Sequence, residues 1–166
     1  MKQVLFFLLI IILASCKHQS ASVTNVQNLK FDSLSARIGE LMEKYKPGLG
    51  EIMTNIQMHH AKLWFSGING NWKLAAYEIK ELKERIEQAK AIETERPEIN
   101  NIPIIYTAID GVEMMISNKN LEGFKSTFSI LTKTCNTCHK TVNFEFNVIT
   151  IPTTLPLSNQ DFRVQP

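Results

Sequence analysis

The sequence lacks the residue patterns that identify zinc sites, nucleic-acid-binding surfaces and catalytic centres. It contains 3 cysteines in 166 residues, with no second Cys-x-x-Cys pair and no close His pair beside a cysteine to complete a structural zinc site. Its 18 Lys and Arg nearly balance its 16 Asp and Glu, so no concentrated basic face predicts nucleic acid as a partner. Acidic and serine side chains are scattered without a catalytic constellation, and we therefore expect no enzymatic activity.

The N-terminal apolar run, residues 4–14, is too short to span a bilayer and fits the core of a secretory signal after Lys2. Small residues just before Cys16 resemble the lipobox of bacterial lipoproteins, which implies cleavage before Cys16 and lipid attachment to its thiol. We expect a signal peptide over 1–15 and a lipidated, flexible tether over 16–31. The exported protein would then be anchored to a bacterial membrane, in the periplasm or on the cell surface. The alternative is an ordinary signal peptide with an incidental cysteine.

The other two cysteines form Cys135-Asn136-Thr137-Cys138-His139, the pattern of c-type haem attachment. On a helix, Cys135 and Cys138 lie one turn apart on one face, so both thiols can reach the vinyl groups of one porphyrin. His139 follows directly and can bind the iron as proximal ligand. The pattern predicts one haem c, attached covalently through Cys135 and Cys138. A thioredoxin-like redox pair would require a βαβ context, whereas the flanking sequence is typical of helix.

The two assignments give each cysteine a separate role. Cys16 takes a lipid, and Cys135 and Cys138 take haem, which leaves no thiol for a disulfide. Export and haem attachment also agree with one another, because c-type cytochromes mature outside the cytoplasmic membrane.

Helical periodicity dominates the middle of the chain, so we expect an all-α fold, an antiparallel four-helix bundle over 32–143. A short amphipathic segment over 32–45 precedes helices over about 47–67, 71–93, 103–117 and from 120 to the haem motif. Apolar residues recur at steps of three and four along the second of these helices: Ala75, Ile79, Leu82, Ile86 and Ala89. In the last helix the cysteines continue the same seam: Leu121, Phe124, Phe128, Leu131, Cys135 and Cys138.

After the motif, apolar and polar residues alternate over 142–148, which is typical of extended chain. We expect 144–166 to form an extended C-terminal tail that lies across the bundle and covers the haem edge near His139. Loose order is the alternative for 157–166.

A haem motif near the end of the last helix of a bundle resembles the class II c-type cytochromes, the cytochrome c′ group. The resemblance is most specific over 120–139 and extends from about 47 to 143. Its implication is that a side chain on the first long helix faces the distal side of the iron and decides the activity. Homodimers, common in that family, are implied as well. The long tail, the lipid signal and the His59-His60 pair depart from the family pattern.

Met53 occupies the position that resembles the distal residue, so it is the first choice as sixth ligand, with core packing as the alternative. His60 is the rival, but it lies about 10 Å further along the helix, so both cannot bind one iron. His59 is expected to face solvent. Gln57 and Trp64 are further candidates for contact with the haem.

We therefore expect an electron-carrying mono-haem cytochrome that docks redox partner proteins. One alternative is a five-coordinate haem protein that binds nitric oxide or carbon monoxide, with Met53 serving only in packing. Another is a lipoprotein without haem, in which Cys135 and Cys138 form a redox pair.

Overall fold

The computed structural model describes residues 25–165, and every regular element in this part of the chain is a helix. A helix over residues 25–45 comes first. It is followed by α2 (Leu49–Ile68), α3 (Trp72–Ile92), the 3-10 helix η1 (Pro97–Ile105), α4 (Tyr106–Ser117) and α5 (Leu121–Thr141). The predicted all-α class is confirmed.

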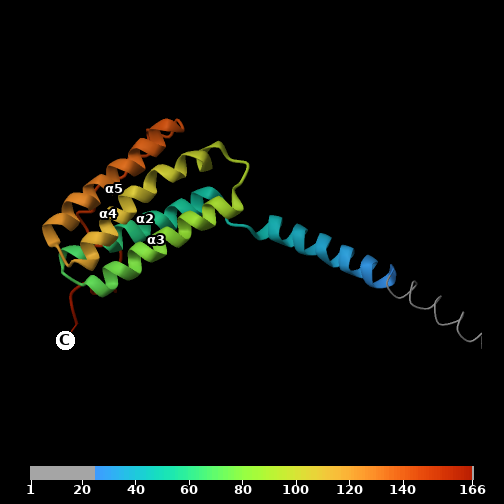
Figure 1. Ribbon diagram of the computed structural model, residues 1–166, viewed down its shortest axis with the longest axis horizontal. Coiled ribbons are helices and arrows are strands. Elements are labelled where there is room, and N and C mark those ends of the chain that lie inside the picture. Colours follow the sequence, from blue (N-terminus) through green and yellow to red (C-terminus); the bar gives the residue numbers. More distant parts are fainter. Residues whose placement is uncertain (1–24, 166) are drawn as a thin grey trace, which may run out of the picture. The chain divides into compact units, whose positions relative to one another are not determined.

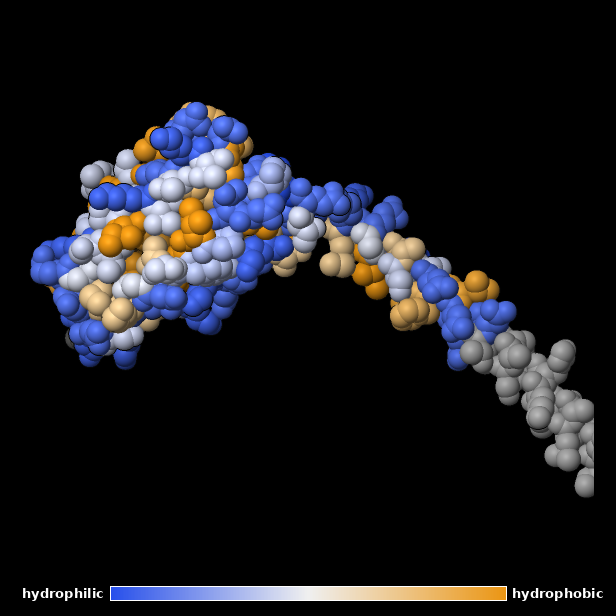
Figure 2. All heavy atoms as spheres, turned by 45° about the horizontal axis from the view of Figure 1, so that its top comes forward, coloured by the Kyte–Doolittle hydropathy of each residue, from blue (hydrophilic) through white to orange (hydrophobic). Residues whose placement is uncertain are grey.

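The chain divides into two units, residues 1–46 and 47–166. In the first unit the helix already includes residues 25–31, which we had assigned to the tether. Exposed apolar side chains are interspersed with polar ones along this helix (Figure 2): Val26, Leu29, Phe31, Leu34, Ile38, Leu41, Met42 and Tyr45. Each helix within residues 25–165 is too short or too polar to span a bilayer. The unit that contains Cys135–His139 is residues 47–166, and the helix that includes Asp32 belongs to the other unit.

The pair α2 and α3 forms close to where the periodicity predicted it, and the two helices pack against one another. Gly70 links them with φ 68°, a left-handed conformation that costs glycine little. Asn71 then caps α3, because its Oδ1 accepts a hydrogen bond of 3.2 Å from the backbone N–H of Leu74. This turn makes α2 and α3 neighbours along their length (Figure 1).

The segment between α3 and α4 differs from the prediction of one helix over 103–117. Residues from Pro97 form the 3-10 helix η1, and α4 begins only at Tyr106. Pro103 has no backbone N–H to donate to the turn before it, so the shorter 3-10 turns replace an α-helix here. As a result η1 contacts α5 as well as α3 and α4, and it contributes to the wall of the candidate site.

The predicted apolar seams form the core, except for Leu121 in the first turn of α5, which is 36% exposed. All five seam residues of α3 are buried, as are Ile105, Ile109, Val112 and Ile116 in and just before α4. In α5 the side chains of Phe124, Phe128 and Leu131 are fully buried, and Trp64 of α2 packs on both phenylalanine rings. Since Cys135 packs against the same cluster, the haem motif continues the buried side of its helix.

The C-terminal tail, residues 143–165, has no regular secondary structure but is held against the helices. Close to α5, the side chain of Asn136 hydrogen-bonds the backbone of Ile149. Further on, Phe162 is buried with its ring centroid 5.8 Å from that of Phe65, and Asn71 Nδ2 donates to the Arg163 carbonyl at 3.1 Å. The alternative of loose order over 157–166 therefore does not describe residues 162–163.

Gly67 is required where α2 meets α5. A Cβ on Gly67 would overlap the Phe124 ring, which is itself fully buried and cannot move aside freely. We expect Gly67→Ala to lower the free energy of unfolding by about 1–3 kcal/mol, the usual cost of overpacking a core. Urea denaturation measures the change.

Gly111→Ala in α4 is the matched control, because its added Cβ would meet Thr127 at an ordinary 3.6 Å. Replacing a mid-helix glycine with alanine favours the helix, so the control should be neutral or more stable by up to about 1 kcal/mol. Equal destabilisation by both substitutions would contradict the assigned contact.

Candidate functional site

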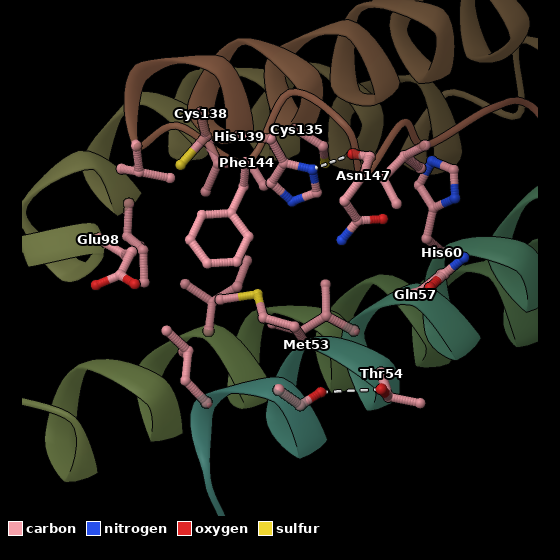
Figure 3. A pocket seen from close by; sticks show the side chains of 18 of the residues that line it. Met53, Thr54, Gln57, His60, Glu98, Cys135, Cys138, His139, Phe144 and Asn147 are labelled. Carbon is pink, nitrogen blue, oxygen red and sulfur yellow. Dashed lines mark hydrogen bonds between the residues drawn. The ribbon is translucent and has the colours of Figure 1, made fainter. Parts of the chain in front are cut away.

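One cavity of about 330 Å³ brings together most of the residues that the sequence singled out. Its walls come from α2, α3, η1, α5 and the start of the tail, and they are predominantly apolar (Figure 3). The predicted site residues that line it are Met53, Gln57, His60, Cys135, Cys138 and His139. The cavity is therefore the candidate cofactor site.

Cys135 and Cys138 lie one turn apart on α5 and both face the cavity. Burial raises the pKa of the Cys135 thiol to about 12 and also raises the pKa of Cys138. Both groups are therefore protonated thiols at neutral pH. Nucleophilic redox cysteines depend on a lowered pKa, so this environment does not favour thiol–disulfide exchange.

His139 is fixed by a hydrogen bond to the tail. Its Nδ1 lies 2.6 Å from the carbonyl oxygen of Asn147 (Figure 3). Because a carbonyl only accepts, Nδ1 carries the proton, and Nε2 of the neutral ring keeps its lone pair. A metal-bound histidine needs this arrangement, with one nitrogen held by a second partner and the other free to bind.

Met53 lies across the cavity from His139. It comes from α2, whereas Cys138 and His139 come from α5 on the opposite wall (Figure 3). The ring of Phe144, from the tail, projects into the space between the two walls. Met53 is partly buried against the core. Its thioether sulfur is one of the groups that bind haem iron as an axial ligand in c-type cytochromes.

His60 also lines the cavity, but its ring is buried and contacts core residues of α5. Its Nε2 lies 2.9 Å from Thr132 Oγ1, and its ring packs 4.4 Å from Phe128. Thr132 Oγ1 donates its own proton to the Phe128 carbonyl at 3.0 Å, so it accepts from His60 Nε2–H. The Nε2 atom of His60 thus has no free lone pair for iron.

Burial makes His60 a source of acid sensitivity. It lowers the pKa of this side chain from 6.5 to about 4. Because the unfolded chain binds the proton more readily, the free energy of unfolding should fall as the pH drops from about 6.5 to about 4, by up to about 3 kcal/mol. Urea denaturation at pH 7 and pH 4.5 measures the loss.

His60→Gln keeps a side chain that can donate to Thr132 but cannot titrate. Its stability should therefore fall less over this pH interval than that of the natural protein. Parallel pH profiles for the two proteins would show that His60 is not the buried titrating group.

Two expectations change with the structure. His59 does not simply face solvent: its Nδ1 lies 2.7 Å from Oε2 of the fully buried Glu78, whose Oε1 is 3.5 Å from Lys62 Nζ. The signal in the sequence was a charged residue on the apolar side of α3, beside Ile79. Trp64 packs on Phe124 and Phe128 instead of lining the cavity.

Sequence reasoning missed several residues that complete the walls. Glu98 comes from η1 and forms an ion pair of 2.8 Å with Arg96, the residue just before η1, whereas Phe144, Asn147 and Ile149 come from the tail. The alternation over 142–148 predicts a tail near His139 but not which of its residues line the cavity, and nothing in the sequence indicates that Arg96 and Glu98 lie there.

The predicted lipid site, Cys16, lies outside the described residues. Within residues 25–165, no group of three or more His, Cys, Asp or Glu side chains could hold a metal ion. No family model, curated protein or solved structure matches this chain.

Proposed function

We propose that this protein is an exported, lipid-anchored, mono-haem c-type cytochrome that carries electrons. Its folded part would be an antiparallel four-helix bundle of the class II kind, formed by α2 to α5. The observation that supports this most is the meeting of Cys135, Cys138 and His139 at one apolar cavity, with His139 Nδ1 engaged and Nε2 free. Lipid on Cys16 would tether the protein, and redox proteins would be its partners. The protein would also pair as a homodimer.

The chemistry of the donor set fits a covalently held haem. The two thiols lie beside an apolar space into which an imidazole and a thioether also face. Phe144 occupies part of this space, so a porphyrin requires its ring to move. That movement is feasible because Phe144 is 38% exposed and belongs to the tail rather than to a helix.

Each residue would have a distinct task. Cys135 and Cys138 would hold the group through two thioether bonds, and His139 Nε2 would bind the iron. Met53 would be the ligand on the opposite side, and a His and Met pair raises the reduction potential relative to two histidines. The apolar walls would exclude water from the centre. When bound, haem supplies an iron that changes oxidation state by one electron.

Absorption and magnetic circular dichroism spectra of the ferric and ferrous protein test this proposal. We expect low-spin iron in both states and a sulfur-to-iron charge-transfer band in the ferric form. High-spin ferric iron that binds carbon monoxide readily after reduction would favour the gas-binding alternative.

A further inference from the structure

We propose that Asn136, the residue after the first motif cysteine, is a positioning residue for His139. Its side chain holds the tail in place, so that the Asn147 carbonyl keeps its hydrogen bond with His139 Nδ1. This hydrogen bond in turn tunes the reduction potential of the iron. The inference rests on the proposed function, because it concerns what the histidine does as an iron ligand.

The clamp begins with the way α5 ends. Asn143 has φ 62°, a left-handed conformation that asparagine tolerates better than most side chains. The N–H of Asn143 donates to the Lys140 carbonyl at 3.3 Å, and the N–H of Phe144 donates to the His139 carbonyl at 2.8 Å. These are the two bonds of a Schellman motif. They turn the chain back toward α5 directly after the haem motif.

The side chain of Asn136 then fixes the segment of the tail that runs back along α5. Its Nδ2 donates to the Ile149 carbonyl at 2.8 Å, and its Oδ1 accepts from the Ile149 N–H at 2.8 Å. An amide that both donates to and accepts from one residue satisfies both backbone groups of that residue, as a neighbouring β-strand would. Both bonds are partly buried, which protects them from competing water.

Only one residue, Val148, separates the clamped Ile149 from Asn147. With the Schellman turn on one side and the clamp on the other, the Asn147 carbonyl is held 2.6 Å from His139 Nδ1. A hydrogen bond at Nδ1 makes the other ring nitrogen a stronger donor. Stronger donation stabilises the ferric iron more than the ferrous iron, so the intact clamp lowers the reduction potential.

The experiment compares Asn136→Ala with Thr137→Ala in the haem-loaded protein. Thr137 is the other residue between the cysteines, is exposed, and donates only to the Lys133 carbonyl within its own helix at 3.0 Å. We expect hydrogen exchange at the Ile149 amide to become about tenfold faster in Asn136→Ala, as the loss of one or two hydrogen bonds implies. The reduction potential should rise in this variant. Neither quantity should change in Thr137→Ala.

Asn136→Leu provides a second variant of nearly the same size. It removes both the donor to the Ile149 carbonyl and the acceptor for the Ile149 N–H without adding charge, so its exchange rate and potential should also rise above those of Thr137→Ala. An unchanged Ile149 exchange rate in both Asn136 variants would show that there is no clamp. Faster exchange with an unchanged potential would show that the clamp holds the tail without tuning the iron.

A natural protein without haem would instead overturn the proposed function, and the positioning role with it. Haem in the natural protein with no rise in potential in either Asn136 variant would overturn the positioning role alone.

Discussion

Met53→Ala is expected to convert low-spin, six-coordinate iron into high-spin iron with an open sixth position. Met53 lies across the cavity from His139, whereas His60 uses its Nε2 atom in the core. Removing the thioether therefore removes the donor that faces His139 across the cavity. If the iron–sulfur bond contributes about 3 kcal/mol, the ferrous form should bind carbon monoxide roughly 100-fold more tightly. The sulfur-to-iron charge-transfer band should disappear.

Met58→Ala is the matched control, because Met58 lies on the same helix, is also half-buried, and is not among the cavity-lining residues. Its spectrum and carbon monoxide affinity should be those of the natural protein. If low-spin iron survives Met53→Ala but is lost in His60→Ala, the sixth ligand is His60.

Replacing both Cys135 and Cys138 with alanine should abolish covalent haem, from one haem per chain to none. The two thiols are the only cysteines in the described residues, and both face the cavity. His139 and Met53 would remain, so any haem retained by the variant would be held by coordination alone. Haem staining after denaturing electrophoresis measures the covalent fraction, since non-covalent haem is lost there.

Cys16→Ala separates the third cysteine from the other two. It should prevent lipid attachment and release the protein from the membrane while leaving the covalent haem in place. Loss of haem in this variant, or retention of covalent haem in the double variant, would contradict the separate roles of the three cysteines.

Much of the helical framework could be predicted because its signals are local. Asn71 and Asn120 each cap a helix where a helix was expected to begin, with Oδ1 accepting from the N–H three positions later. The seam from Ala75 to Ala89 is buried because an apolar residue every three to four positions places one continuous stripe on one side of a helix. The same reasoning placed the motif cysteines at the buried side of α5.

The site itself depends on contacts between segments far apart in sequence. Asn136 meets Ile149, and His139 meets Asn147, through a turn whose left-handed residue is an asparagine rather than the usual glycine. His59 meets Glu78 across two helices. Periodicity gives the side of a helix on which a residue lies but not the neighbour it finds there, so these pairs had no signature of their own.

Intact mass spectrometry of the mature protein under denaturing conditions tests the central claim most directly. We expect the polypeptide mass to be increased by one haem that denaturation does not release, and fragmentation should place the haem on the peptide that contains Cys135 and Cys138. A mass that corresponds to the polypeptide without haem, with the two thiols free or joined as a disulfide, would contradict the account.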